Sequence, residues 1–292
     1  MPAHASGAGR GGSSTAEESE QDIEQPPGFA QRFGGALDSV VQQVGEIGVL
    51  FGQVVYTAVR YPKGYWADAR DDTFYVLKRV FFPAVAVLAG YGLLAASFAV
   101  AILLFLGAAN RLGTVYLTFS VREIAPLFTG VVISGAIGAA TTSELGARKI
   151  REELDALRVL GQDPIRLIVL PRVIACTLIM TVMNILGVVV TTGEALMVTH
   201  ILGNVSYGAF MNSFIDDITV GEIVGNLVKT AIIGLFIGVI AASKGLTVTR
   251  GAEGVGRAVN QSVVINLLMV FIVDNIFNLI LLALDPNITV SR

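Results

Sequence analysis

The 292-residue sequence contains little charge for its length. Charged side chains make up 15% of it, against about 25% in soluble proteins, and 53% of its residues are hydrophobic. The formal net charge of −3 at pH 7 leaves no basic excess with which to bind DNA or RNA. The composition therefore indicates an integral membrane protein and excludes a nucleic-acid partner.

Cysteine and histidine are almost absent. Cys176 is the single cysteine, so no disulfide framework can form within the chain, and His4 and His200 are the two histidines. They stand alone and do not form a cluster with the spacing of a metal site. The serines lack a histidine partner that would activate them as nucleophiles. We therefore expect no catalytic residue, no metal site and no cofactor bound by this chain.

A glycine-rich stretch, G-A-E-G-V-G-R at residues 251–257, is a weak candidate for a nucleotide site. It lacks the Gly-Lys-Ser or Gly-Lys-Thr ending of a phosphate-binding loop and does not follow a strand. We expect it in a short loop between two membrane spans. Any energy input must then come from a separate chain.

Long apolar runs are absent from the first part of the chain. Residues 1–28 are rich in Gly, Ser, Glu and Pro and predict a disordered cytoplasmic tail. Residues 29–79 predict an interfacial amphipathic helix that ends at Tyr61-Pro62, followed by an aromatic and basic membrane anchor. A helix packed in a small soluble domain is the alternative. The expected apolar face of the helix comprises Phe33, Leu37, Val40, Val44, Ile47, Phe51, Val54 and Ala58.

Five apolar runs then predict transmembrane helices, which need about 20 residues each. The fold class we expect is all-α, with a five-span domain at residues 80–284 and an outer-side tail at 285–292. The second run is marginal in length, and Pro171 should kink the third. The runs are Val80–Ala108, Ala125–Thr142, Ile165–Ile201, Ile223–Ser243 and Val263–Leu284.

Basic residues fix the expected orientation. Placing the N-terminus in the cytoplasm puts most Lys and Arg side chains on that side and leaves Arg111, Arg122 and Arg292 outside. We therefore expect an inner-membrane protein with a cytoplasmic N-terminus and an outer C-terminus.

Small residues recur along the second run, at Gly130, Ser134, Gly138 and Thr142. In lipid, helices associate through close packing, which small residues permit. This spacing predicts that the second span is the innermost one. Whether it packs within one subunit or across a dimer is left open.

Polar side chains within the spans are costly and face partners or a cavity. Asn184, Glu194, Lys229 and Asp274 are the candidates. Glu194 and Lys229 reach similar depth, and we predict that they pair or share a wet outer cavity. Interhelical hydrogen bonds are favoured over substrate contact for the group.

Most of the charge between the apolar runs lies in residues 142–171, here called the charged segment. Gly146 and Gly161 bracket strong helix formers, which predict a helix of about four turns. Asp163-Pro164 should cap and restart the next helix. A solvated loop helix is the alternative, but the apolar face would need a cover. Ile150, Leu154, Leu157 and Leu160 form this face, and the expected i,i+4 ion pairs are Arg148–Glu152 and Arg151–Asp155.

The charged segment also carries a family resemblance. E-L-G-A-R-K-I-R-E-E-L-D-A-L-R-V-L-G-Q-D-P-I-R, followed by L-P-R-V-I-A, resembles the signature of MlaE/YrbE lipid-transport permeases. K-G-L-T-V-T-R-G-A-E-G-V-G-R-A-V-N-Q-S-V-V is similar to the second cytoplasmic loop of that family. The similarity covers residues 80–284 and is strongest to the actinobacterial YrbE permeases associated with Mce proteins.

The resemblance implies an ABC-type transporter that passes a hydrophobic lipid, sterol or fatty acid to or from an MCE-protein assembly on the outer side, with import expected. Two different YrbE-type permeases would form a heterodimer on a cytoplasmic dimer of ABC ATPases, which would bind ATP and Mg. A passive scaffold or channel without ATP coupling is the alternative. The charged segment would then contain the coupling helix, with the expected coupling residues Arg148, Arg151, Glu152, Glu153, Asp155, Leu157 and Arg158.

Overall fold

The computed structural model describes residues 29–284 except residues 63, 109–110 and 250. These residues form helices joined by short connections, and no strand occurs in this part of the chain. The chain divides into two units, Met1–Gly45 and Glu46–Arg292. The described part of the first unit, residues 29–45, is helical. The predictions for residues 1–28 and 285–292 lie outside the described residues.

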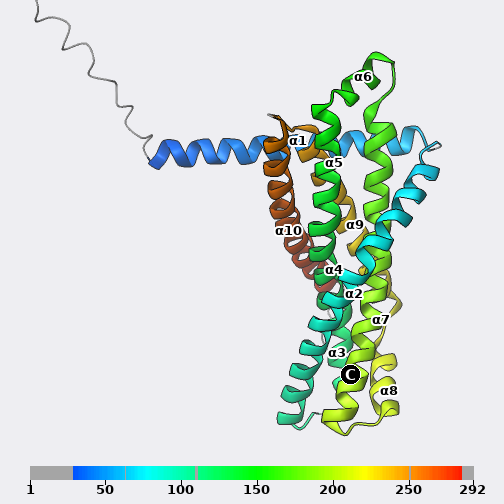
Figure 1. Cartoon of the computed structure of the whole chain (residues 1–292). Helices are drawn as coiled ribbons and strands as arrows, with labels where there is room; N and C mark the ends of the chain where they lie inside the picture. Colours follow the sequence, from blue (N-terminus) through cyan, green and yellow to red (C-terminus); the bar gives the residue numbers. More distant parts are fainter. Residues whose placement is uncertain (1–28, 63, 109–110, 250, 285–292) are drawn as a thin grey trace, which may run out of the picture. The chain divides into compact units, whose positions relative to one another are not determined.

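Five helical stretches are long and apolar enough to cross a membrane, as predicted. They are α2 (Trp66–Phe105), the continuous stretch Leu112–Ile150, the stretch Ile165–Gly203, α9 (Val220–Leu246) and α10 (Gly251–Leu284). A shorter helix, α8 (Tyr207–Asp217), connects the third stretch to α9. Figure 1 shows α6 (Glu153–Val159) at one end of the second unit and α3 and α8 at the opposite end. These are called the α6 end and the α8 end below.

Several predicted boundaries are wrong because the helices continue beyond their apolar portions. The first helical span begins at Trp66 and not at Val80, so residues 66–79 are part of the same helix, and their role as a membrane anchor stays a prediction. The glycine-rich stretch 251–257 forms the first turns of α10 instead of a loop. Hydrophobicity marks the part of a helix that suits lipid, whereas backbone hydrogen bonding carries the helix further into polar surroundings.

The second span is longer than predicted and is irregular. It consists of α3 (Leu112–Phe119), a π turn at Ser120–Ile124, α4 (Ala125–Ile133), a second π turn at Ser134–Gly138, and α5 (Ala139–Ile150). The third span begins with a π turn at Ile165–Val169, directly before α7 (Leu170–Gly203), where Pro171 was expected to kink the helix. A π turn adds a residue to one turn and so rotates the side chains that follow it.

The prediction that the second span is innermost is confirmed. Of the five apolar stretches it has the largest buried share, 56%. A Cβ atom added at Gly130 would lie 2.8 Å from Val270, and one added at Gly138 would lie 2.6 Å from Asn266. Thr142 donates a hydrogen bond to the Ala241 carbonyl at 3.0 Å. The small residues therefore allow α9 and α10 to approach the second span within one chain.

The first helix, α1, spans Phe29–Arg60 and ends where Tyr61-Pro62 predicted. Within the second unit, Leu50 and Val54 are buried, and the Phe51 ring stacks on Phe236 of α9 with centroids 5.5 Å apart. Val44 is 63% exposed, so this part of the expected apolar face does not pack against the described part of the chain. The expected face residues Phe33, Leu37 and Val40 lie outside the described side chains. The interfacial position of α1 stays a prediction.

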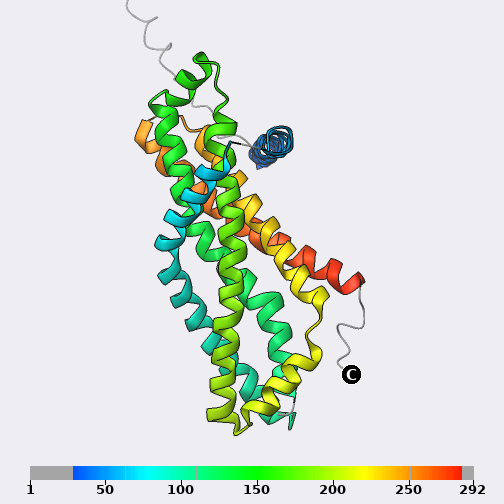
Figure 2. The same cartoon turned by 90° about the vertical axis from the view of Figure 1, so that its right-hand side faces the viewer.

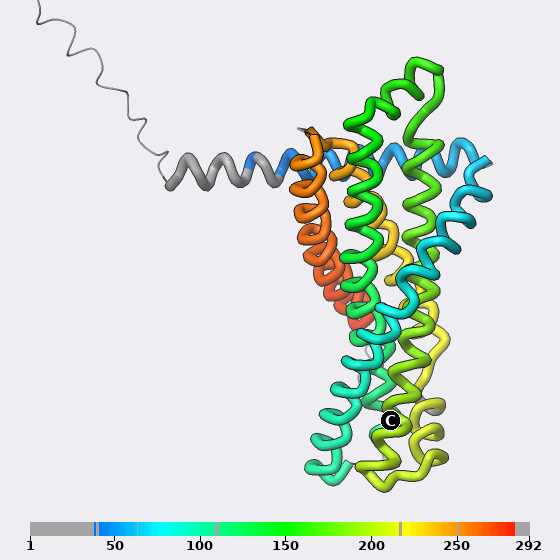
Figure 3. The backbone as a smooth tube through the Cα atoms, in the orientation of Figure 1, coloured from blue at the N-terminus to red at the C-terminus, as the bar shows by residue number. Residues whose placement is uncertain are grey.

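The core of the second unit extends along its whole length. Figures 2 and 3 show α7 extending along the second unit, with α9 beside only part of its length. Its central cluster contains Ala84, Ile133, Met180, Ile237 and Val270, one from each of the five spans. This packing holds the charged segment at one end and a buried group of polar residues toward the other.

Candidate functional site

The charged segment contains two helices and a turn, not the single helix predicted between Gly146 and Gly161. Helix α5 ends at Ile150, and α6 spans Glu153–Val159. Glu152 between them has a left-handed backbone with φ of 59°, which interrupts the helix and redirects the chain. Gly161 follows α6 with φ of 72°, as expected of a residue after a helix end.

Both predicted i,i+4 ion pairs are wrong because the break at Glu152 destroys that spacing. Instead, the Arg151 Nε atom lies 2.8 Å from Glu153, and Lys149 and Arg158 bind Asp155 at 3.1 and 2.9 Å. The hydrogen bond from Lys149, followed by the effects of its charge and that of Arg158, holds the pKa of Asp155 below its usual value. The acidic side chains of α6 are thus already paired within the segment.

The apolar face of the segment is divided between the interior and the surface. Leu154 is 1% exposed and fixes α6 to the bundle, and Leu157 is half-buried. Val159 and Leu160 are 89% and 73% exposed, so the predicted face does not close on the chain itself. The Asp163 carboxylate accepts a hydrogen bond from the Ile165 N–H at 2.9 Å, which confirms the predicted cap.

An ion-pair chain links α6 to three spans. Arg148 of α5 lies 3.7 Å from both Glu153 of α6 and Glu144 of α5. Glu144 also binds Arg172 of α7, whose Nε atom lies 4.0 Å from Asp72 of α2. The Arg172 side chain is 14% exposed and that of Glu144 is 49% exposed, so the pair lies at the boundary between the protein interior and solvent. A displacement of α6 would therefore act directly on α5, α7 and α2.

The predicted pair of Glu194 and Lys229 is wrong. Lys229 of α9 binds Asp274 of α10 at 2.8 Å, and both side chains are 1% exposed. The Lys229 ammonium also donates to the Asn278 side chain at 3.0 Å and to the Arg122 carbonyl. Similar depth in two spans did not bring Glu194 and Lys229 together, because Glu194 faces Gly92 of α2 and Lys229 faces α10.

The Lys229–Asp274 pair belongs to a larger polar network, which comprises Arg122, Glu123, Glu222, Lys229, Asp274 and Asn278. Asn278 donates to Glu123 at 2.6 Å, and Arg122 binds Glu222 at 2.5 Å. Glu222 also forms a capping box with Thr219 at the start of α9. The network joins the second, fourth and fifth spans.

Sequence reasoning missed Arg122, Glu123 and Glu222 because they lay outside the predicted spans. Arg122 was expected in an outer connection, but it lies in the π turn Ser120–Ile124 within a continuous helix. The i,i+4 spacing of Asp274 and Asn278 was a usable signal, because it places two polar groups on one face of an apolar helix.

The two remaining intramembrane candidates lie apart from the network. Glu194 is half-buried and packs against Gly92 of α2, where any Cβ atom would collide with its carboxylate. Asn184 is fully buried, and neither of its amide atoms has a hydrogen-bond partner in the portion of the chain that the structure describes.

An apolar groove of about 940 Å³ runs along α2, α3 and α4 and reaches the polar network. Five aromatic rings stand among aliphatic side chains in its wall, and Tyr91 and Phe128 stack with centroids 3.8 Å apart. Arg122 and Glu123 line it as well, so that one site combines a hydrocarbon-like wall with charged groups. This arrangement suits an amphiphile whose chains contact the aromatic wall and whose polar part meets the charges.

Comparison with known proteins identifies the family. A family model described as Permease MlaE matches residues 73–280, which is most of the chain. The chain belongs to the MlaE permease family. The match includes the charged segment, all members of the polar network, and nearly all of the five spans.

Relatives of this MlaE permease agree with that assignment. It is 37% identical over 169 residues to a probable ABC transporter permease protein of Synechocystis, covering 58% of this chain and 64% of that protein. It is 35% identical over 162 residues to the chloroplastic protein TRIGALACTOSYLDIACYLGLYCEROL 1 of Arabidopsis thaliana, covering 56% of this chain and 46% of that one. The matches thus span less than two thirds of these relatives' own lengths. The protein is a multi-pass membrane protein of the MlaE permease family.

Proposed function

We propose that this chain is the permease subunit of an ATP-driven lipid transporter, with α6 as the helix that an ABC ATPase engages. The observation that carries the proposal is the exposed apolar tip of α6. Val159 and Leu160 remain in solvent although the rest of α6 is anchored by Leu154 and paired charges. Exposed apolar groups at a rigid, polar-flanked site are typical of a protein interface.

The mechanical part of the proposal rests on the ion-pair chain. When the ATPase dimer binds ATP and Mg and closes, it displaces α6. Arg148 transmits that displacement to Glu144, and Glu144 transmits it to Arg172 and α7. Since α2 packs along α7, the wall of the groove changes its position with them.

The groove along α2, α3 and α4 is the proposed lipid path. Its aromatic wall accepts acyl chains or a sterol skeleton, and Arg122 and Glu123 meet the polar end of the lipid. The α6 end then faces the cytoplasm of the inner membrane, and the α8 end faces outward. This orientation follows the basic residues of the connections at the α6 end.

The family match supports a proposal for the partners. We propose a second YrbE-type permease, a cytoplasmic dimer of ABC ATPases, and an MCE-protein assembly at the α8 end, with the lipid imported. The chain binds no nucleotide in this scheme, because ATP and Mg belong to the ATPase. A passive channel or scaffold would function without ATP and without contact at α6.

Leu160→Glu tests the proposal more cleanly than charge reversal of Glu153 or Asp155, whose ion pairs stabilise α6. The matched control is Ile215→Glu on α8, because Ile215 is 57% exposed at the opposite end. We expect Leu160→Glu to abolish copurification of the ATPase and ATP-dependent lipid transfer in proteoliposomes, while membrane insertion remains. Lipid transfer that persists without the ATPase contradicts the proposal. Equal ATPase copurification and lipid transfer in Leu160→Glu and Ile215→Glu contradict it as well.

A further inference from the structure

A second cavity, of about 1010 Å³, lies at the α6 end of the bundle. Its walls are α2 and α5, with α7 behind them and the first turns of α10 at the side. Figures 1 and 3 show α2 and α5 diverging in this region. The cavity shares no lining residue with the groove that ends at the polar network. It is therefore a separate site in the other half of the molecule.

The lining of this cavity changes from charged to apolar along its length. Asp72 and Arg79 of α2 lie with Glu144 and Arg172 in the part nearer α6. Pro83 and Ile179 lie further along α2 and α7, in the apolar part. The distance from residue 72 to residue 83 along a helix is about 16 Å, close to half of a hydrocarbon core about 30 Å thick. The cavity thus has the length and polarity of one membrane leaflet.

The residues of α2 that line the cavity share one face of that helix. Asp72, Val76, Arg79 and Pro83 follow each other at steps of four, three and four. Arg79 is exposed and has no ion-pair partner among the residues that the structure places. Arg172, by contrast, is held by Glu144. The charged part of the cavity therefore offers one available guanidinium, that of Arg79. It also offers the Asp72 carboxylate, whose only ion-pair contact within the described chain is with Arg172 at 4.0 Å.

We propose that this cavity binds a phospholipid of the leaflet at the α6 end. The Arg79 guanidinium binds the phosphate, because its planar donors match phosphate oxygens. Asp72 receives the positively charged amine of a headgroup such as ethanolamine, and one acyl chain enters between α2 and α5 along Val80 and Ile179. The four charged residues sum to zero, which suits a zwitterionic headgroup.

This occupant fits the cavity better than a protein segment does. The apolar part opens beside α2 and α5 at membrane depth, where acyl chains are the surrounding medium. A second permease that covered the same opening would have to bring its own counter-charge to Arg79, because an unpaired charge is costly there. The inference requires that the chain lies in a bilayer, and it does not depend on ATP coupling or on docking at α6.

Photolabelling in the assembled complex tests the site. The complex is reconstituted in nanodiscs that contain a phosphatidylethanolamine with a diazirine in its acyl chain, illuminated, digested and analysed by mass spectrometry. We expect adducts on the cavity-lining peptides around Ile137 and Ile179. Arg79→Glu should lower their yield by about fivefold or more, because a charge-assisted contact is lost and repulsion replaces it.

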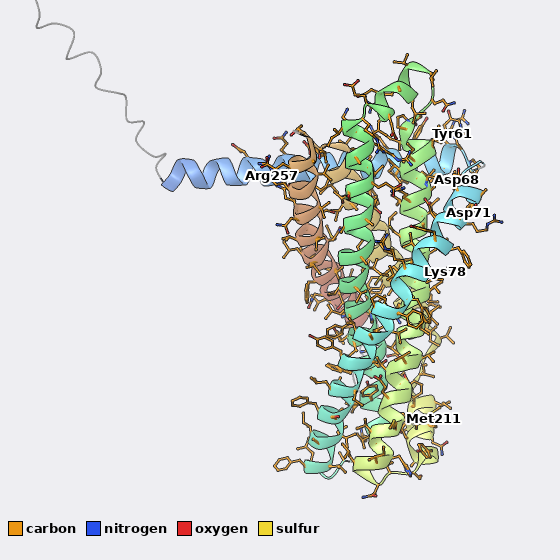
Figure 4. All side chains as sticks on the ribbon, viewed as in Figure 1. Tyr61, Asp68, Asp71, Lys78, Met211 and Arg257 are labelled. Carbon is orange, nitrogen blue, oxygen red and sulfur yellow. The ribbon has the colours of Figure 1, made fainter. Side chains whose placement is uncertain are left out.

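Lys78→Glu is the matched control for charge. Lys78, labelled in Figure 4, precedes Arg79 on α2. Its ammonium lies over the Phe74 ring, and its side chain is exposed and does not line the cavity. A second pair of variants tests volume: Ala140→Trp fills the cavity, whereas Ala101→Trp places the same ring on an exposed position outside both cavities. Labelling should fall in Ala140→Trp and persist in Ala101→Trp.

Two outcomes overturn the proposal. One is equal labelling of the cavity peptides in Arg79→Glu and Lys78→Glu, together with unchanged labelling in Ala140→Trp. The other is a permease–permease product, in place of a lipid adduct, from a photoreactive residue installed at Ala140. The ATPase content of each preparation is measured in parallel. If the wild-type preparation contains no ATPase but its cavity peptides are labelled, the proposed function is rejected. The proposed lipid site is then still supported.

Discussion

Lys229 is a buried cation whose position depends on a few specific partners. Its ammonium binds Asp274 at 2.8 Å and Asn278 at 3.0 Å, and all three helices of the polar network contribute to its surroundings. Removing one member of a buried ion pair leaves the other charge uncompensated, whereas replacing both members by apolar groups is often tolerated. This difference makes the pair testable.

We expect Lys229→Met to lower the free energy of unfolding by about 3–5 kcal/mol and the double variant Lys229→Met/Asp274→Leu to recover much of that loss. The measurement is denaturant unfolding in mixed micelles, analysed as a double-mutant cycle. Glu194→Gln, combined with Lys229→Met, serves as the control and should show additive effects. Strong coupling of Glu194 to Lys229, with none for Asp274, would contradict the structure.

At the residue scale, the sequence identified which polar side chains matter but not how they pair. Asn184, Glu194, Lys229 and Asp274 stood out because polar groups are rare in apolar runs. Their depth could be counted along each helix. Their direction around the helix axis could not, because the π turns and the packing of α9 against α10 decide which side chains face each other.

At the scale of elements, α7 and α9 approach each other through glycine. A Cβ atom added at Gly234 would lie 2.8 Å from Thr177 Cα and 2.9 Å from the Cys176 carbonyl oxygen, and one at Gly238 would lie 3.0 Å from Val173 Cα. Backbone atoms cannot move aside as a flexible side chain can. The contact between these spans therefore requires glycine at position 234.

Gly234→Ala should separate α7 from α9 and destabilise the protein by about 1–3 kcal/mol, as overpacked cores do. Gly193→Ala on α7 is the control, since nothing lies within 4 Å of an added Cβ atom there. Thermal melting in detergent compares the two variants. A melting temperature of Gly234→Ala equal to that of Gly193→Ala would show that the two spans can separate without cost.

The charged segment shows why an element's type is easier to predict than its course. Strong helix formers predicted helix, and most of residues 146–159 are helical. The turn at Glu152 was not predictable, because no glycine or proline marks it and glutamate rarely adopts a left-handed backbone. The ion pairs of Arg148 and Lys149 with Glu153 and Asp155 form only after this turn and hold it in place.

At the scale of the whole molecule, the ion-pair chain connects the surface of α6 to three membrane spans. Arg148 is the link between α6 and α5, and it does not line either large cavity. In the proposed function, the ion-pair chain carries energy from the ATPase to the spans. A break at Arg148 should then separate ATP hydrolysis from transport.

We expect Arg148→Gln to keep the ATPase bound and hydrolysing ATP while ATP-driven lipid transfer falls by about fivefold or more, the scale of a typical coupling energy. Arg70→Gln is the control, because the one ion pair that Arg70 forms among the described residues is an exposed one with Asp71. Transfer and ATPase activity are measured on the same proteoliposomes. Equal ATP-driven lipid transfer in Arg148→Gln and Arg70→Gln would show that the ion-pair chain does not couple ATP hydrolysis to transport.

The sequence by itself determined the class of protein. Scarce charge and five apolar runs place the chain in a membrane, since only helices satisfy their own backbone hydrogen bonds in lipid. The motifs of residues 144–175 and 244–264 predicted the family, which the match over residues 73–280 confirmed. Both conclusions depend on local composition and on residue order along the chain.

Only the tertiary structure decided what the polar residues do. Partners such as Arg122 with Glu222, or Asp72 with Arg172, are about a hundred residues apart in the sequence and meet through helix packing. The two cavities likewise form between spans, so no single stretch of sequence encodes their lining. Periodicity fixes which residues share a face of one helix, whereas the rotation of each helix against its neighbours depends on the packing of all of them.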